Sequence, residues 1–377
     1  NAIISSMKLT KCIIPAIALT LLLTSCGNSK NSDSVKFTKQ LGIGYNWGNT
    51  MESWGTGQLE TGWGAPVSTK EMFEDLKNRG INTIRIPVAW SFRMNDNNKI
   101  YPPLEGRVNE IVDMALDSGM YVILNIHWDG GWINDKSYGF TKKYSKCMKK
   151  YTDIWTQICE RYKDYDQHLI FESLNEEGCF DNVWNRYAGD SQEKKEAAFG
   201  LLNKINQTFV DIVRTSGGNN KNRYLLIAGY ATDIDMTCQP EFKMPKDPKK
   251  HCMISVHYYT PATFAILTED ASWGKNQTTW GSANDISLLQ TNMIKMKDNF
   301  SDKGYGVIIG EYGCPVLNKE PESVRKYLTE VATRAYDLGF CPILWGAATD
   351  IYNRRELRFD DPAIGEMYMA LSKKARQ

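Results

Sequence analysis

The chain has 377 residues, 42% of them hydrophobic and 24% charged, and its formal net charge is +1. This length and composition are typical of a globular protein with a substantial buried core, and they exclude a disordered chain. The charge balance is even and no long run of one sign occurs, so we expect an uncharged binding partner and no nucleic acid.

The first 26 residues are typical of an export leader. Lys8 and Lys11 precede an apolar run, residues 13–23, that is shorter than the about 20 residues needed to span a bilayer. The run ends in Leu23-Thr-Ser-Cys26, which resembles a bacterial lipobox. We therefore expect residues 1–26 to be upstream residues plus a lipoprotein-type signal peptide, with membrane anchoring only through lipidated Cys26. The protein would then be a cell-envelope or cell-surface lipoprotein, or otherwise secreted if the cysteine is incidental. Residues 27–40 are predicted to be a polar tether.

From Leu41 onward, short apolar segments alternate with amphipathic ones. The apolar segments lack polar alternation, which is typical of parallel strands covered on both faces. Strands are predicted at 41–47, 83–90, 121–128, 169–175, 224–230, 253–259, 307–311 and 342–345, and helices at 70–79, 107–117, 147–162, 193–215, 286–299, 323–338 and 363–374. This order favours an α/β fold, a (β/α)8 TIM barrel, although a doubly wound open sheet shares the pattern.

The residues at the strand ends distinguish these two folds. In a barrel, the loops that follow all the strands converge on one mouth. Here polar and aromatic residues occur at or near most of these ends: Asn46, Arg85, His127, Asn175, Glu176, His257, Tyr259, Glu311 and Trp345. No Gly-x-Gly-x-x-Gly follows a strand, so a dinucleotide-binding fold loses its main support. We predict a single catalytic barrel domain over residues 41–377, and we expect a monomer.

The sequence does not indicate metal or disulfide chemistry. The four histidines have no zinc-type spacing and no Cys-x-x-Cys occurs, so we expect no metal and no cofactor. Seven cysteines follow residue 26, an odd number, and several lie in apolar runs. We therefore expect most of them to be buried small hydrophobic residues rather than disulfide partners.

Two glutamates carry the functional prediction. Glu176 ends the segment Leu169-Ile-Phe-Glu-Ser-Leu-Asn-Glu, and Glu311 ends Gly306-Val-Ile-Ile-Gly-Glu, each just after an apolar strand and shortly before a glycine. A lone Asn-Glu pair is more often a solvated loop acid. Two carboxyl groups that each end an apolar strand in the same way match the paired acids of glycoside hydrolysis.

The chain resembles glycoside hydrolase family 5 from Leu41 to its end. The resemblance is carried by Asn46-Trp-Gly-Asn-Thr50, Ile84-Arg-Ile-Pro87, Asn125-Ile-His127, Asn175-Glu176, His257-Tyr-Tyr259, Gly310-Glu-Tyr-Gly313 and Trp345. It implies a retaining endo-β-glycanase with Glu176 as acid/base and Glu311 as nucleophile. It also implies supporting roles for Arg85, His127, Asn175, His257, Tyr259 and Trp345, and a cis Trp345–Gly346 peptide bond.

These roles have physical requirements. An ionised Glu311 needs donors that lower its pKa, and Arg85 and Tyr259 are candidates. A protonated Glu176 needs burial or a nearby negative charge. Two alternatives to these site roles remain open. Arg85 could neutralise a buried acid such as Glu172, and His127 and His257 could be core residues.

Aromatic residues indicate the substrate class. Six tryptophans lie in or beside the predicted loops: Trp54, Trp63, Trp128, Trp132, Trp273 and Trp280. We expect about half of them, with Trp128 and Trp132 among the candidates, to line a cleft for a long neutral glycan. Trp128 and Gly346-Ala-Ala-Thr-Asp350 depart from the family pattern, which leaves substrate choice open. Cellulose-type β-1,4-glucan is the first expectation, with xyloglucan, mixed-linkage glucan and mannan as alternatives. A non-catalytic polysaccharide-binding protein on a degenerate barrel is the alternative of another class.

Overall fold

Eight parallel strands form a closed barrel in chain order, and β1 pairs with both β2 and β8. The computed structural model describes residues 32–55, 57–129, 131–133, 143–178, 183–346 and 351–374. The strands are β1 (Gly44–Asn46), β2 (Thr83–Ile86), β3 (Tyr121–Asn125), β4 (Leu169–Glu172), β5 (Leu225–Ala228), β6 (Cys252–Tyr258), β7 (Gly306–Tyr312) and β8 (Cys341–Leu344). All eight predicted strands are present, and closure of the sheet excludes the doubly wound alternative.

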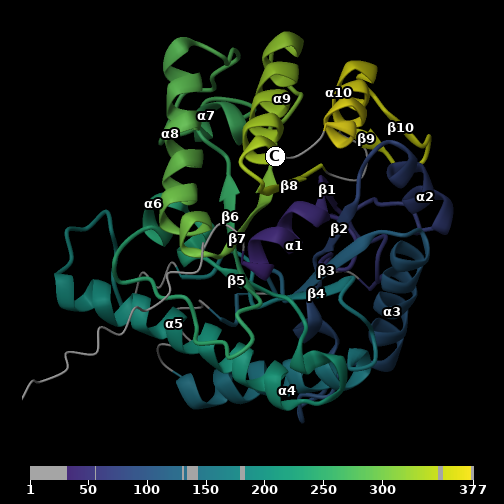
Figure 1. Cartoon of the computed structure of the whole chain (residues 1–377), viewed down its shortest axis with the longest axis vertical. Helices are drawn as coiled ribbons and strands as arrows, with labels where there is room; N and C mark the ends of the chain where they lie inside the picture. The colour runs from purple at the N-terminus through teal and green to yellow at the C-terminus, as the bar shows by residue number, and fades with distance from the viewer. Residues whose placement is uncertain are drawn as a thin grey trace, which may run out of the picture.

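Amphipathic helices surround the barrel (Figure 1). The helices that follow the strands are α2 (Lys70–Asn78), α3 (Pro102–Asp117), α4 (Tyr144–Tyr162), α5 (Gln192–Thr215), α8 (Ala283–Asn299), α9 (Pro321–Asp337) and α10 (Pro362–Lys373). Each of the predicted helices is present. Helix α3 begins five residues before its predicted start because prolines occupy its first turn, where the backbone needs no N–H donor.

Short elements lie in the loops between strands and helices. Among the described residues they are α6 (Ile234–Thr237), α7 (Ala262–Ala265), four 3-10 turns, and a hairpin of β9 (Tyr352–Asn353) and β10 (Arg358–Phe359) that precedes α10. Most of them follow β2, β5, β6 and β8, so they enlarge the loops at the end of the barrel where strands terminate. None of these short elements was predicted from the sequence.

Apolar side chains form two cores. The larger core lies between the barrel and the helices and includes Leu76, Val112, Trp155, Phe209 and Leu328. The smaller core is built from Ile123, Ile170, Leu226, Met253, Ile308 and Ile343 of the strands together with Phe37 and Leu41. Burial on both faces explains why the strand sequences show no polar alternation.

Helix α1 (Asp33–Leu41) closes one end of the barrel and corrects the predicted boundary of the tether. Its residues 33–40 were expected to be part of a polar linker, but Phe37 and Leu41 are buried in the smaller core. Phe37 stacks on Tyr224 with ring centroids 3.6 Å apart. Ser32 caps the helix by accepting a hydrogen bond from the Val35 N–H. The helix was missed because its apolar residues are few and lie among serines and lysines.

The described part of the chain contains no helix long and apolar enough to cross a membrane. Residues 1–31 lie outside the described residues, so the predicted leader is not described. Six cysteines are described, none of them forms a disulfide with another described residue, and all but Cys238 are buried. Burial confirms the prediction for those five, while Cys179 lies outside the described residues.

Candidate active site

Glu176 and Glu311 face each other where β4 and β7 end. A carboxylate oxygen of Glu176 and one of Glu311 lie within 4.8 Å of each other. The Glu311 side chain is only 7% exposed, whereas that of Glu176 is 50% exposed. The structure therefore brings together the two acids that lie 135 positions apart in the sequence.

A bulge in β7 aims Glu311 into the barrel mouth. Val256 pairs with Ile309 and His257 pairs with Glu311, so Gly310 is an extra residue on β7. Such a bulge changes the direction of the side chain that follows it. A Cβ atom at Gly310 would lie 2.6 Å from the Ser255 hydroxyl oxygen, so the bulge requires glycine.

The Arg85 guanidinium connects both glutamate loops to the barrel interior. This fully buried side chain donates from Nε to Glu172 at 2.6 Å, from one terminal nitrogen to Glu311 at 2.8 Å, and from the other to Asn175 at 2.8 Å. Asn46 is also fully buried and accepts a further bond from Arg85 at 2.9 Å. Both interpretations of Arg85 are therefore correct, since it neutralises Glu172 and also holds Glu311.

His257 and Tyr259 complete the contacts of the two acids. His257 Nδ1 lies 2.7 Å from Glu176 Oε1 and 3.6 Å from Glu311 Oε2. The Tyr259 hydroxyl donates to Glu311 Oε2 at 2.9 Å. Each oxygen of Glu311 thus has one strong donor, Arg85 for Oε1 and Tyr259 for Oε2, which fixes the orientation of the carboxyl group.

The pKa shifts of Glu311 and Glu176 are opposite to those predicted, which were a lowered pKa for Glu311 and a raised pKa for Glu176. Burial raises the pKa of Glu311 above its usual value, although the charges of His257 and Arg85 act against it. Burial also acts to raise the pKa of Glu176, but the hydrogen bond and charge of His257 outweigh it, so the pKa of Glu176 is lowered. The sequence placed His257 near the mouth but did not reveal that its Nδ1 contacts Glu176.

Trp345 and His127 form a stacked pair beside the acids. Their rings are 5.7 Å apart and nearly parallel, with an interplanar angle of 5°. His127 is buried, and burial together with the Arg85 charge holds its pKa well below the usual value, so the ring is neutral. A Cβ atom at Gly48 would lie 2.9 Å from the Trp345 indole, so glycine is required for this close approach.

The prediction of a cis peptide bond between Trp345 and Gly346 was wrong. Among the described residues the cis peptide is Thr260–Pro261. The Trp345 backbone N–H donates to the Tyr312 carbonyl at 2.8 Å. Residues 347–350 of the departure Gly346-Ala-Ala-Thr-Asp350 lie outside the described residues.

Four aromatic rings form an exposed cluster in the loops after β1, β2 and β3. Trp54 lies 6.1 Å from Trp63, 5.5 Å from Phe92 and 4.7 Å from Trp128, measured between ring centroids. Each ring is between 36% and 42% exposed. We call Trp54, Trp63, Phe92 and Trp128 the aromatic cluster. Phe92 was not predicted from the sequence.

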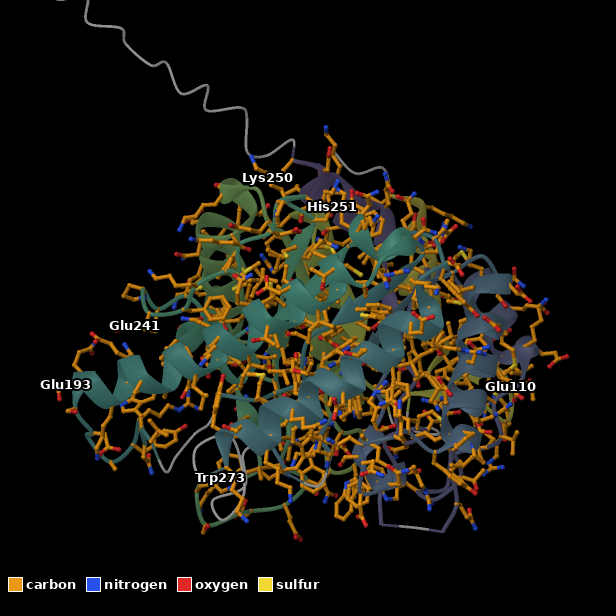
Figure 2. The ribbon with its side chains drawn as sticks, turned by 90° about the horizontal axis from the view of Figure 1, so that it is seen from below. Glu110, Glu193, Glu241, Lys250, His251 and Trp273 are labelled. Carbon is orange, nitrogen blue, oxygen red and sulfur yellow. The ribbon has the colours of Figure 1, made fainter. Side chains whose placement is uncertain are left out.

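The remaining tryptophans divide between surface and core. Trp273 is 59% exposed, and Figure 2 shows it at the edge of the molecule far from Lys250 and His251. Trp280 and Trp132 are buried. Trp132 was a candidate for binding substrate, but its indole N–H donates to Asp129 at 3.1 Å and its ring packs in the core. It therefore offers no free face for a sugar.

Several buried polar residues near the site were missed. Asn125 and Ser255 donate to the Glu172 carboxylate at 3.1 and 3.0 Å. Glu177 is 4% exposed and accepts a hydrogen bond from the Asn175 backbone N–H at 2.7 Å. Arg354 lies over the Trp47 ring at 4.0 Å and donates to the Gly48 carbonyl at 2.9 Å. In the sequence, Glu177 could have been identified because it directly follows Glu176. The other missed residues could not, because their contacts join segments that are distant in the sequence.

The same groups also meet the spacing of a cation site. Glu176, His257 and Glu311 each place one ligand atom within 4.8 Å of the others. Two carboxylates and an imidazole are suitable ligands for several divalent metals. Each of these side chains, however, already has a hydrogen-bond or ion-pair partner within the site.

A closed (β/α)8 barrel with two facing carboxyl groups at its mouth defines a barrel glycoside hydrolase. Residues 47–348 match the family described as Cellulase (glycosyl hydrolase family 5), and the chain belongs to this family. It is 35% identical over 343 residues to endoglucanase A of Clostridium longisporum, a match that covers 86% of this chain and 63% of that protein.

Two further relatives differ in their named substrates. A xyloglucan-specific endo-beta-1,4-glucanase of Bacteroides ovatus is 32% identical, with 83% of this chain and 65% of that protein covered. The structure is similar to a mutant lichenase of Caldicellulosiruptor sp. F32 in complex with cellotetraose, with a TM-score of 0.81, 31% identity, and 99% and 100% of the two chains covered. The chain thus spans about two thirds or less of the lengths of the two curated relatives.

Proposed function

We propose that this protein is a retaining endo-β-1,4-glucanase in which Glu311 is the nucleophile and Glu176 the acid/base. The observation that carries the proposal is the spacing of the two carboxyl groups, whose oxygens lie within 4.8 Å of each other. Retaining enzymes place these groups about 5–5.5 Å apart, whereas inverting enzymes need about 6.5–9.5 Å to admit water between them. The spacing supports double displacement.

In the first step Glu311 attacks the anomeric carbon. Arg85 and Tyr259 hold one oxygen each, so the carboxylate is oriented before the sugar arrives. The Asn175 side-chain oxygen accepts from Arg85, which leaves its N–H groups to donate to the 2-hydroxyl of the sugar. That contact strengthens as the oxocarbenium-like transition state forms.

The proton for the leaving oxygen comes from the Glu176–His257 pair. The two side chains share a contact of 2.7 Å, and the pKa of Glu176 is lowered mainly by this partner, against the effect of burial. When the glycosidic oxygen approaches, Glu176 donates the proton, and in the second step it accepts one from the attacking water.

The substrate is proposed to be a β-1,4-glucan chain that crosses the mouth of the barrel. The Trp345 ring, which stacks on the buried His127, supplies a flat surface beside the two acids. The aromatic cluster supplies a second exposed apolar surface for more distant sugar units. Xyloglucan, mixed-linkage glucan and mannan remain alternatives. Product analysis on soluble cellulose derivative, xyloglucan, mixed-linkage glucan, xylan and mannan tests the preference.

The roles of Glu311 and Glu176 can be distinguished by how the activity of each alanine variant depends on the leaving group of the substrate. Glu311→Ala should lose activity on every glycoside because the attacking atom is gone. Glu176→Ala should lose about 10²–10⁴-fold on glucan chains, which need acid assistance. It should still form the glycosyl-enzyme from a dinitrophenyl cellobioside, whose phenol departs without a proton, and added azide should accelerate turnover.

The same measurements test the alternatives. If Glu176→Ala were equally inactive on both substrates and unaffected by azide, the acid/base assignment would be wrong. If the unmodified protein bound glucans without releasing products, it would be a binding protein on a degenerate barrel. Loss of hydrolysis after chelation would favour a metal-dependent reaction over the two-carboxylate mechanism, which needs no metal.

We also propose that the protein is exported and anchored through lipidated Cys26, and that it acts as a monomer. The support for the anchor is the Leu23-Thr-Ser-Cys26 sequence after an apolar run. Intact-mass measurement of the processed protein tests it, because a diacylglycerol on Cys26 adds a defined mass. Sedimentation of the protein in detergent tests whether it is a monomer.

A further inference from the structure

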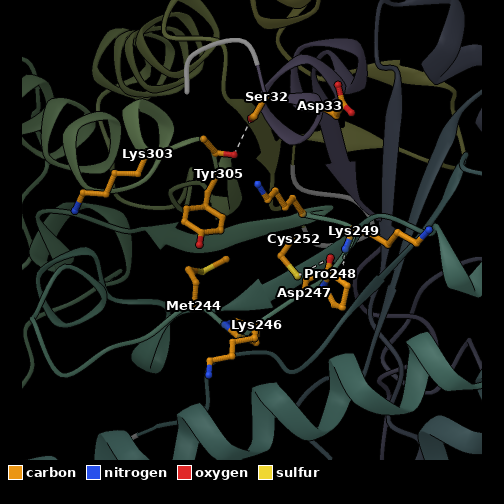
Figure 3. Close-up of a pocket in the computed structure, with 13 residues that line it drawn as sticks. Ser32, Asp33, Met244, Lys246, Asp247, Pro248, Lys249, Cys252, Lys303 and Tyr305 are labelled. Carbon is orange, nitrogen blue, oxygen red and sulfur yellow. Dashed lines mark hydrogen bonds between the residues drawn. The ribbon is translucent and has the colours of Figure 1, made fainter. Parts of the chain in front are cut away.

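A large cavity lies at the end of the barrel opposite the two acids. Its volume is about 1080 Å³, and its lining includes Met244, Cys252, Gly304 and Tyr305 (Figure 3). β6 and β7 begin at this end, with Cys252 and Gly306, whereas His257 and Glu311 lie toward their other ends. In Figure 2, Lys250 and His251 lie on the opposite side of the molecule from Trp273.

The rim of this cavity is basic. Lys246, Lys249, Lys250 and Lys303 are exposed and line the cavity, and none of them forms an ion pair with another described residue. We call these four lysines the basic rim. Figure 3 shows Lys249 and Lys303 on opposite sides of it.

Two acids also line the cavity, but they do not balance the lysines. Asp247 is engaged by Arg214 through two hydrogen bonds of 2.8 Å and accepts the His251 backbone N–H at 2.9 Å. Asp33 is the only other acid that lines it among the described residues, so the four lysines outnumber the one carboxylate without a basic partner. Charge of one sign on a rim around a hollow favours an anionic partner.

The chain enters the fold beside the basic rim. Ser32 donates to the Gly304 carbonyl at 2.7 Å, and Ser34 donates to the Cys252 carbonyl at 2.8 Å while accepting from the Gly306 N–H at 2.9 Å. The start of α1 is therefore held against the cavity, because Gly304 and Cys252 line it. Cys26 is six positions before Ser32, and six residues span at most about 20 Å.

We propose that the basic rim lies against anionic phospholipid headgroups when the protein is anchored, so that the two acids face away from the membrane. The proposal rests on the anchor at Cys26 proposed above. A lipid on Cys26 keeps Ser32, which lines the same cavity as the basic rim, within about 20 Å of the headgroups. Phosphate groups of the bilayer supply the negative charge, and each lysine near such a surface strengthens association by about fivefold. The site for the glucan is then open to polymer outside the membrane.

Amine labelling of the whole anchored protein tests this orientation. The protein is produced in a bacterial host that processes lipoproteins and is reconstituted into vesicles of phosphatidylcholine or of an equimolar mixture with phosphatidylglycerol. A membrane-impermeant amine reagent is added, and labelling of each lysine is measured by mass spectrometry. Lys99 and Lys275 are exposed lysines outside the rim and serve as internal controls.

Labelling of the basic rim relative to Lys99 and Lys275 should fall about fivefold or more in the phosphatidylglycerol vesicles and recover in high salt. The double variant Lys249→Glu and Lys250→Glu should restore labelling of Lys246 and Lys303 in the same vesicles. Its hydrolysis of soluble glucan should equal that of the unmodified protein, because these lysines lie at the far end of the barrel.

Equal labelling in the two kinds of vesicle, with the acyl group on Cys26 verified by intact mass, would overturn the orientation and leave the anchor intact. Absence of the acyl group would overturn the anchor and the orientation together. Neither result would affect the proposed glucanase, because that activity is measured separately on soluble substrate.

Discussion

Glu177 should make the protein less stable as the pH rises. Its carboxyl group is 4% exposed, and burial, with added repulsion from Glu176 and Glu172, raises its pKa from 4.5 to about 8. In the unfolded chain the group loses its proton near pH 4.5, but in the folded protein it keeps the proton until about pH 8. The stability that depends on this proton is complete below pH 4.5 and is lost as the pH rises through about 8.

The size of the effect follows from the two pKa values. Each pKa unit corresponds to about 1.4 kcal/mol. With values of 4.5 and about 8, ionisation of Glu177 should cost about 1 kcal/mol at pH 5.5 and about 4 to 5 kcal/mol at pH 8.5. Glu177→Gln is neutral at every pH, and its amide oxygen can still accept the Asn175 N–H. The unmodified protein should therefore lose about 3 kcal/mol more than this variant between pH 5.5 and 8.5.

Urea unfolding followed by tryptophan fluorescence at pH 5.5, 7.0 and 8.5, at constant ionic strength, gives this difference. Glu52 and Asp129 also have a pKa raised by burial, to about 7 and about 6, but they contribute equally to both proteins. Glu366→Gln, at an exposed position, is the matched control. A free-energy difference between Glu177→Gln and the unmodified protein that stayed constant across this pH range would refute the reasoning.

Other substitutions test separate parts of the structure. Gly48→Ala should push the Trp345 indole out of place, because overpacking costs about 1–3 kcal/mol, and should lower kcat/KM on glucan about tenfold. An unchanged kcat/KM would contradict the close contact. Arg85→Lys should lower kcat/KM by at least about 10²-fold and the free energy of unfolding by about 3–5 kcal/mol. The reason is that one ammonium group cannot reach all the acceptors that the guanidinium contacts. Phe37→Ala should cost about 3–5 kcal/mol in urea unfolding and leave kcat unchanged, whereas a mere tether would tolerate it. Trp128→Ala should raise KM several-fold on long glucan chains and leave kcat on dinitrophenyl cellobioside unaltered; equal effects on both substrates would remove the aromatic cluster from chain binding.

The sequence by itself determined the barrel and the position of its mouth. Apolar segments without polar alternation predicted eight buried parallel strands, because strands covered on both faces have no polar side. Glu176 and Glu311 each follow such a segment, and the ends of parallel strands meet at one edge, so their proximity could be predicted. These are local patterns, and each can be recognised in a short stretch of chain.

Tertiary structure alone decided the details that depend on contacts between distant segments. Helix α1 is held by the barrel interior rather than by strong local periodicity. Trp132 is buried because its indole N–H bonds to Asp129 and its ring packs in the core, although its neighbours in the sequence resemble those of an exposed loop. The pKa order of Glu176 and Glu311 depends on His257, 81 positions from Glu176, and on burial that no residue type reveals. Electrostatic energies vary with distance and solvent exposure, and both are properties of the folded molecule.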